Sequence, residues 1–253
     1  MKTHENTQFV IVGMAGSGKT TFCQRVVSWL MEYELKTKIN NLTETDHVSP
    51  LTTTEIVNLD PAVLNTKIPS TIDIRDHIDF DEVMEKYDLG PNGAILTCLN
   101  LFFMKNINFN LKKYTVFDAP GQIDALTWCS PAKILYTKPN TIILFVIDSS
   151  EQSNAYSMIA NLIFAASLKE KYKNAKVLLV FNKMDINVGN NKVEKYLDHF
   201  YVSENIKESD VTTLSTFFSE FWENMDFIKV SSKTGEGKKA FYDFLEEYIK
   251  NKL

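Results

Sequence analysis

The chain has 253 residues and a mass of 29.0 kDa, the size of one large domain or two small ones. Hydrophobic residues make up 44 % and charged residues 23 %, an ordinary globular composition that argues against a disordered, collagen-like or coiled-coil chain. A formal net charge of −5 argues against nucleic-acid binding by bulk electrostatics, so we expect no direct nucleic-acid partner.

The spacing of the cysteines favours a reducing compartment, and the shortness of the apolar runs argues against a membrane span. Cys23, Cys98 and Cys129 stand far apart and form no CxxC motif, so we expect neither a disulfide framework nor a structural zinc site. The apolar run over 142–147 is too short to cross a bilayer, and residues 1–8 lack a signal-peptide core. We therefore expect a cytoplasmic protein with no membrane partner.

Short apolar runs alternate with helical patterns along the whole chain. The runs expected to be buried strands cover residues 8–12, 56–59, 116–117, 142–147, 177–181 and 228–230. Apolar residues at helical spacing predict helices over 19–33, 80–87, 153–172 and 238–250, and the polar stretch 40–54 is expected to be a long loop. Because no linker or repeat divides the chain, we predict a single α/β domain, residues 1–253, with a mostly parallel sheet covered by helices on both faces.

A glycine-rich loop follows the first expected strand and opens the first expected helix. Its sequence GMAGSGKT, from Gly13 to Thr20, fits the motif G-x-x-x-x-G-K-[ST] in the strand–loop–helix context that the motif requires, which predicts a P-loop NTPase fold. Backbone N–H groups and the helix N-terminus would surround phosphate oxygens, Lys19 would reach the β- and γ-phosphates, and Thr20 would bind Mg²⁺. The residues expected to contact the nucleotide are Gly13, Met14, Ala15, Gly16, Ser17, Gly18, Lys19, Thr20 and Thr21.

A base-recognition motif follows the strand expected over 177–181. Asn182, Lys183 and Asp185 form N-K-x-D. The Asp185 carboxylate can accept hydrogen bonds from N1–H and the amino group of guanine, donors that adenine does not present in this arrangement. Asn182 would brace the loop, and the Lys183 stem would lie along the base. After the last expected strand, the backbone at Ser231 and Ser232 would supply an N–H group to guanine O6.

Two further carboxylates stand at strand ends. Asp118, Gly121 and Gln122 belong to a D-x-P-G-Q sequence that follows the strand near 116–117. Asp118 would hold Mg²⁺, the Gly121 N–H would touch the γ-phosphate, and Gln122 stands where a water-orienting side chain is needed. Asp60, after the strand expected over 56–59, is a second carboxylate expected near the phosphates.

With these motifs in this order, the chain resembles the GPN-loop GTPases, whose tripeptide stands here as Gly90-Pro91-Asn92. The sequences NLDPA (58–62), IDIRD (72–76), DAPGQ (118–122) and NKMD (182–185) are also similar to that family. The resemblance covers nearly the whole chain, with residues 80–113 as the GPN-loop insertion. Residues 13–21 and 92–102 are most similar to the eukaryotic branch that assists RNA polymerase II assembly and nuclear import.

The resemblance implies a GTP hydrolase that uses Mg²⁺ and converts GTP to GDP and phosphate. It implies a homodimer, or a heterodimer with a paralogous GPN-loop GTPase, in which the Gly90-Pro91-Asn92 loop reaches into the partner's site and Asn92 approaches the γ-phosphate in trans. Asp60 and Gln122 would orient the attacking water, and Lys19 and Asn92 would contact the phosphates. The implied partners are RNA polymerase II subunits or their assembly factors, and the implied location is the cytoplasm with shuttling to the nucleus.

The residues leave other functions open. A GTP-binding switch or scaffold with negligible turnover would use the same motifs, because Asp60 and Gln122 could serve binding alone. A small-molecule kinase would need a cationic lid, and a metal-delivery GTPase would need a Cys/His cluster that the scattered cysteines do not provide. Arg75 is expected to form a salt bridge within 73–76 rather than to act as an arginine finger, and the apolar stretch 99–104 is expected to be core.

Overall fold

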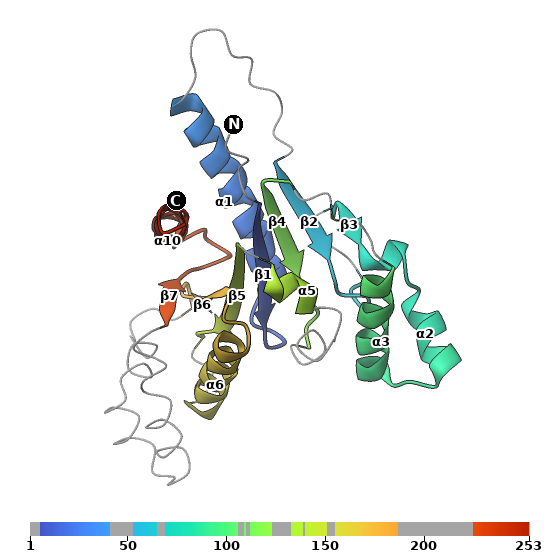
Figure 1. Ribbon diagram of the computed structural model, residues 1–253. Helices are drawn as coiled ribbons and strands as arrows, with labels where there is room; N and C mark the ends of the chain where they lie inside the picture. The colour runs from blue at the N-terminus through green and yellow to red at the C-terminus, as the bar shows by residue number, and fades with distance from the viewer. Residues whose placement is uncertain are drawn as a thin grey trace.

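A seven-stranded sheet organises the chain (Figure 1). The computed structural model describes residues 6–40, 53–64, 69–105, 109, 112–122, 133–138, 140–150, 155–186 and 225–252. The strand order is β3-β2-β4-β1-β5-β6-β7, and every pair of neighbours is parallel, as the alternation of strands and helices predicted. The strands are β1 (Thr7–Gly13), β2 (Thr54–Asn58), β3 (Ile72–Asp73), β4 (Tyr114–Asp118), β5 (Thr141–Asp148), β6 (Lys176–Asn182) and β7 (Asp226–Lys229).

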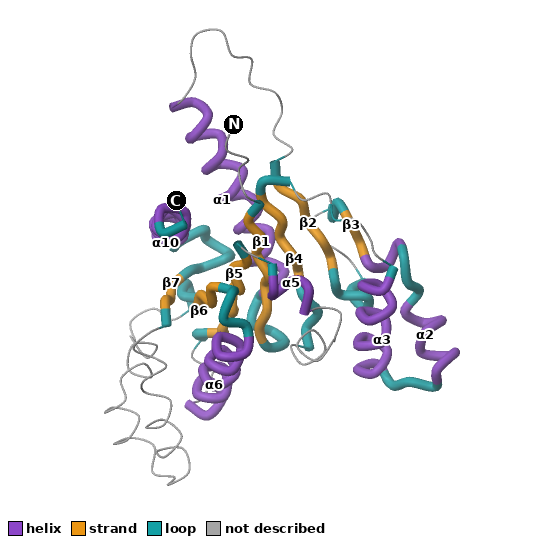
Figure 2. The backbone as a smooth tube through the Cα atoms, in the orientation of Figure 1, coloured by secondary structure: helices purple, strands orange, loops and turns teal. Residues whose placement is uncertain are grey.

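Helices cover both faces of this sheet (Figure 2). Phe9 and Ile11 of β1 pack into one core with α1 and α10, whereas Val10 and Val12 pack into a second core with α3, α5 and α6. Successive side chains of a strand point to opposite faces, so a central strand that is buried on both sides reads as one continuous apolar run. The helices are α1 (Lys19–Asn40), α2 (Phe80–Tyr87), α3 (Pro91–Met104), α5 (Lys133–Thr137), α6 (Ala155–Lys171) and α10 (Lys238–Lys250), with a 3₁₀ turn η1 (Ile74–Asp76).

The predicted elements are confirmed where a regular pattern supported them. Helices α2 and α10 begin and end where the spacing of apolar residues predicted, and each expected strand lies within about a residue or two of its predicted bounds. Helix α1 runs to Asn40, beyond its predicted end at residue 33. Residues 41–52, most of the stretch expected to be a loop, lie outside the described residues, as does Cys129. Among the described residues, no helix is long and apolar enough to span a membrane.

Three elements were not predicted, namely α3, β3 and α5. Helix α3 is apolar on most sides and buries Ala94, Ile95, Cys98, Leu99 and Phe102, so its sequence has no polar face to mark a helical period. The stretch 99–104, expected to be core, is the second half of this helix, and only its last residue, Met104, is strongly exposed. Strand β3 has two residues and α5 has five, lengths at which no periodicity can be read.

The expected GPN-loop insertion contains two helices that pack together. Helices α2 and α3 lie side by side beyond the β3 edge of the sheet, and α3 also contacts η1 (Figure 1). Gly90 is the N-cap of α3, Pro91 is its first helical residue, and Asn92 its second, so the tripeptide is a helix start rather than a free loop. The assignment of residues 1–253 to one domain stays a prediction.

Phe241 of α10 joins two of the elements that cover one face of the sheet. Its ring is fully buried and lies 6.1 Å from the ring of Phe9 and 5.5 Å from that of Trp29. We expect Phe241→Ala to lower the free energy of unfolding by about 3–5 kcal/mol, because it leaves a cavity between α1, α10 and β1. Urea unfolding measures this loss. The exposed neighbour Lys239 provides the control, since Lys239→Ala removes no core contact; equal effects of the two substitutions would contradict this packing.

Candidate functional site

Two glycines of the predicted phosphate loop, Gly13 and Gly18, stand where a side chain would not fit. A Cβ atom added to Gly13, which ends β1, would lie 2.3 Å from the Val146 carbonyl oxygen. Gly18 has a φ of +88°, and an added Cβ would lie 2.6 Å from the Asn182 side-chain nitrogen. Met14, Ala15 and Gly16 form the exposed crest of the loop, and α1 begins at Lys19. The backbone therefore turns closely around the space that phosphates would occupy.

Lys19 lies beside two carboxylates at the carboxyl edge of the sheet. Its side chain is buried, and its Nζ donates to the Met14 carbonyl oxygen at 3.0 Å. Burial lowers the pKa of Lys19, while the negative charges of Asp118 and Asp60 act in the opposite direction. The structure thus brings together the lysine and both carboxylates that the sequence assigned to the phosphates.

Asp118 and Thr20 make a site that fits Mg²⁺. Burial raises the pKa of Asp118 to about 6, although the Thr20 hydroxyl, which donates to the carboxylate, and Lys19 favour its charged form. The Oδ1 atom of Asp118 is buried without a hydrogen-bond partner. Hydroxyl and carboxylate oxygens are the ligands that Mg²⁺ takes, and a cation would satisfy the unpaired oxygen. In the described ranges, no group of three or more His, Cys, Asp or Glu side chains is arranged around a metal position.

Asp60 and Gln122 approach the phosphate side from two loops. The Asp60 carboxylate accepts hydrogen bonds from the Gly121 N–H and from the Ala62 N–H, the latter at 3.0 Å. Burial raises the pKa of Asp60 against these hydrogen bonds. The side chain of Gln122 donates to Asn92 of the same chain. The amide expected to touch the γ-phosphate and the residue expected to orient water are therefore both paired within one chain.

The N-K-x-D residues form a pocket against the phosphate loop. Asn182 donates to the Ser17 carbonyl oxygen at 2.9 Å and accepts from the Ser232 amide and hydroxyl at 3.0 and 2.8 Å, so it braces the two loops as predicted. Asp185 accepts from the Ser231 hydroxyl at 2.6 Å. The pocket has a volume of about 300 Å³ and is lined by Gly18, Thr21, Asn182, Lys183, Asp185, Ile186, Ser232 and Lys233.

The two backbone amides expected near guanine O6 both have hydrogen-bond partners within the chain. The Ser231 amide donates to the Glu236 carbonyl oxygen, and the Ser232 amide donates to Asn182. Both amides are thus used to shape the loop, and the next residue, Lys233, lines the pocket together with Ser232. The contact of the Ser231 and Ser232 backbone with guanine O6 stays a prediction, and the turn that these hydrogen bonds make decides which amide faces the base.

Two residues that hold the lining of this pocket, Asp148 and Arg25, were missed from the sequence. Asp148 ends β5 and accepts from Lys183 Nζ at 2.6 Å, which holds the lysine stem over the pocket. An aspartate at the end of an apolar strand is the signal that identified Asp118, and the same signal marks Asp148. Arg25 of α1 donates to the Ser232 and Lys233 carbonyl oxygens at 2.9–3.1 Å. These segments lie far apart in the chain, and no sequence motif predicts the contact.

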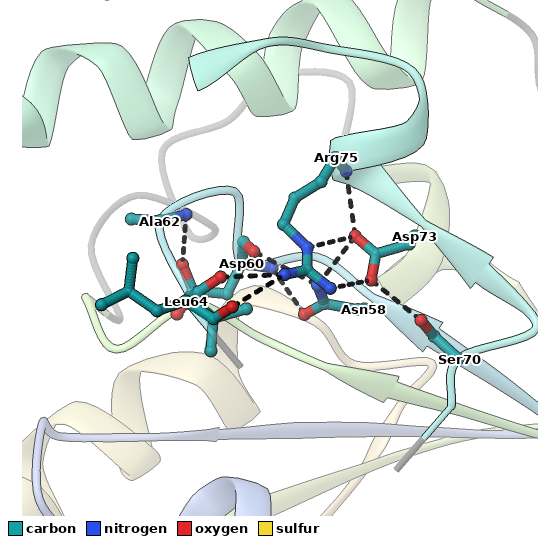
Figure 3. Close-up of polar contacts among 8 residues, drawn as sticks. Asn58, Asp60, Ala62, Leu64, Ser70, Asp73 and Arg75 are labelled. Atoms are coloured by element: carbon teal, nitrogen blue, oxygen red, sulfur yellow. Dashed lines mark hydrogen bonds and ion pairs between the residues drawn. The ribbon is translucent and has the colours of Figure 1, made fainter. Parts of the chain in front are cut away.

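A polar cluster lies behind the loop that carries Asp60 (Figure 3). Arg75 forms the expected salt bridge with Asp73, with Nη2 and Oδ2 2.8 Å apart. Burial alone would raise the pKa of Asp73, but hydrogen bonds from Arg75, Asn58 and Ser70 outweigh it and hold the pKa at about 2. This pair faces the Asp60 loop rather than the phosphate loop.

Comparisons with known proteins agree with this architecture. A family described as "conserved hypothetical ATP binding protein" matches residues 43–251. The proteins named GPN-loop GTPase 1 from Saccharomyces cerevisiae and from Schizosaccharomyces pombe are each 31 % identical over 95 % of this chain, which spans 65 % and 68 % of their lengths. The crystal structure of a GTPase in apo form from Pyrococcus abyssi matches the fold with a TM-score of 0.69, 20 % identity, and coverage of 95 % of this chain and 96 % of that one.

The low pKa of Asp73 predicts a pH-dependent contribution to stability. The pKa of about 2 in the folded chain lies below the ordinary value of 3.8, so the ionised carboxylate stabilises the fold above about pH 4, and this stability is lost as the pH falls toward 2. We expect Asp73→Asn to cost about 1 kcal/mol more at pH 7 than at pH 3, because about half of the stabilisation by the carboxylate is still present at pH 3. Urea unfolding of both chains between pH 3 and pH 7 measures the difference. A cost that does not change with pH would contradict the ion pair.

Proposed function

Because this chain belongs to the GPN-loop GTPase family, we propose that it binds GTP together with Mg²⁺ and hydrolyses it to GDP and phosphate. The description of the matching family names ATP, whereas the relatives are named GTPases. The base pocket is the part of the structure that bears on this choice.

One observation carries the proposal: the phosphate loop and the N-K-x-D loop line the same pocket. Gly18 and Thr21 line it from the phosphate-loop side of the sequence, and Asp185 and Lys233 belong to the loops that follow β6 and β7. A guanine in this space can donate N1–H and its amino group to the Asp185 carboxylate, and its O6 can accept from the Lys233 amide. Adenine has an acceptor at N1 instead of a donor. Its N1 would face the Asp185 carboxylate without a proton between them, and the carboxylate would lose its partner. A pocket of this kind therefore rejects adenine strongly.

The phosphate side supports the hydrolytic step. Lys19 would contact the β- and γ-phosphates, and Thr20 with Asp118 would hold Mg²⁺, which neutralises charge on the phosphates when it is bound. Asp60 and Gln122 orient a water molecule, whose oxygen bonds to the γ-phosphorus while the bond from this phosphorus to the β–γ bridging oxygen breaks. The proton of the water passes to the released phosphate, and GDP leaves with the bridging oxygen.

We further propose that the chain works as a homodimer, or as a heterodimer with a paralogous GPN-loop GTPase, and assists RNA polymerase II assembly or nuclear import in the cytoplasm and nucleus. Family membership supports this proposal. Gly90-Pro91-Asn92 begins a helix packed on the core, so it presents Asn92 on a rigid support, as a residue that reaches a partner's γ-phosphate requires. Recovery of polymerase subunits from a lysate only with GTP-loaded or only with GDP-loaded protein would support the assembly role.

The alternative is a GTP-binding switch with negligible turnover. The contact of Gln122 with Asn92 favours this alternative for an isolated chain, because the side chain expected to orient water is then bonded to another side chain. Release of phosphate over many turnovers at saturating GTP and Mg²⁺ separates hydrolysis from binding alone.

Asp185 provides a test of base recognition. We expect Asp185→Asn to lower the affinity for GTP by about 100-fold or more, because the amide cannot accept both guanine donors. The same variant should gain affinity for xanthosine triphosphate, whose oxygen at C2 accepts from the new amide. Competition against a fluorescent GTP analogue measures both affinities. Loss of both nucleotides would indicate a collapsed pocket, and unchanged GTP preference would show that Asp185 does not contact the base.

Mixing two inactive chains tests whether Asn92 acts in trans. Asn92→Ala leaves its own phosphate loop intact, and Lys19→Ala leaves its own Asn92 intact, so a mixed dimer contains one complete site. We expect each variant alone to be inactive and an equal mixture to regain about a quarter of the wild-type rate, since half of the dimers are mixed and each has one working site of two. A mixture that stays inactive, from chains shown to exchange, would place Asn92 in its own chain's site.

A further inference from the structure

Asp60 stands on a loop, so its position depends on what holds that loop. The loop leaves β2 at Asn58, and the structure describes it to Leu64. Asn58 Oδ1 accepts from the Asp60 amide at 3.1 Å, and Asn58 Nδ2 donates to the Asp60 carbonyl oxygen at 3.2 Å. The buried Asn58 side chain therefore bonds both the N–H group and the carbonyl oxygen of Asp60.

Asn58 is in turn held by Asp73 of the edge strand β3. Asn58 and Asp73 are register partners in the parallel β2–β3 pair, and Asn58 Nδ2 donates to Asp73 Oδ1 at 3.0 Å. Asp73 is 5 % exposed, and both of its oxygens accept further hydrogen bonds, from Ser70 Oγ at 2.9 Å and from the Arg75 amide and guanidinium at 2.8–2.9 Å. This carboxylate is saturated with donors and so has one orientation.

Arg75 connects Asp73 to the far side of the same loop. Its Nε and Nη2 donate to the two oxygens of Asp73, and its Nη1 donates to the Val63 carbonyl oxygen at 3.0 Å and to that of Leu64 at 3.5 Å (Figure 3). The guanidinium thus bridges the edge strand and the loop after Asp60. We refer to Asn58, Ser70, Asp73 and Arg75 as the Asp73 brace.

We propose that the Asp73 brace is a positioning device for GTP hydrolysis, in which Arg75 and Asp73 hold the Asp60 carboxylate at the Gly121 amide where the attacking water must be bound. This inference rests on the proposed function. Arg75 acts through Asp60 and touches no phosphate, because its guanidinium is directed to Asp73 and to the loop carbonyls. Its loss therefore affects the chemical step and leaves nucleotide binding, which depends on the phosphate loop and the base pocket, intact.

Steady-state kinetics and nucleotide binding of Arg75 variants test the inference. We expect Arg75→Gln to lower kcat by about 10- to 100-fold, because a catalytic group displaced by an ångström loses much of its effect. Its Kd for a non-hydrolysable GTP analogue should stay within about threefold of wild type, the pattern of an interaction used only in the transition state. Arg75→Lys should recover part of kcat, since an ammonium can pair with Asp73 but cannot span it and the Val63 carbonyl together.

Asp76 provides a matched control. It is an exposed carboxylate next to Arg75 and lies outside the brace, so Asp76→Asn removes a nearby charge and none of these hydrogen bonds. We expect its kcat and Kd to equal those of wild type. Amide hydrogen exchange supplies a readout that needs no turnover: the Asp60 and Ala62 amides should exchange faster in Arg75→Gln than in Asp76→Asn or wild type.

Each outcome decides the inference. Wild-type kcat in Arg75→Gln, or an equal loss of kcat in Asp76→Asn, would overturn it. A loss of analogue binding that matches the loss of kcat would also overturn it, because the brace would then serve binding. A wild-type protein that binds GTP without turnover would refute the proposed hydrolysis, and the positioning role with it, whereas unchanged exchange in an active protein would refute the brace alone.

Discussion

The site depends on the register of the parallel strands. The pairing places Asn58 opposite both Asp73 and Asp118, and Asp148 opposite Asn182, all at the carboxyl ends of their strands. Parallel strands end at the same edge of a sheet, and a shift of one residue would turn each of these side chains to the other face. The apolar residues that precede them are buried on both faces, so the two cores fix this register and, with it, the polar groups that surround the nucleotide.

Buried charge is the second constraint on this edge. Lys19, Asp60 and Asp118 lie in low-dielectric surroundings, and burial shifts the pKa of each toward its neutral form. A phosphate chain and a divalent cation would bring compensating charges to all three groups. In the base pocket, Asn182, Asp185 and Asp148 are held by hydrogen bonds within the chain, so that half of the site is preformed.

The sequence was most informative where a short segment carries either a chemical motif or a clear spacing of apolar residues. The phosphate loop, the N-K-x-D loop and the amphipathic helices α2 and α10 could be predicted because each carries its signal locally. Helix α3 could not, since apolar residues lie on most of its sides and mark no helical period, although Gly90 before Pro91 is a helix-start signal that marks its beginning. The contacts of Asn58 with Asp73 and of Arg25 with Ser232 join segments far apart in the chain, and only the folded sheet reveals them.

The central position of β1 has a consequence for biosynthesis. Its two neighbours are β4 and β5, which follow it in the chain, so this strand has no partner until the chain has been made to Tyr114 and beyond. At usual rates of translation this interval lasts on the order of ten seconds. During it, Phe9–Val12 is an apolar segment with two unpaired edges, the kind of segment that associates with other chains. Nascent-chain protection by chaperones should therefore matter most before β5 emerges, and premature arrest in this interval would release a chain that cannot build its phosphate loop.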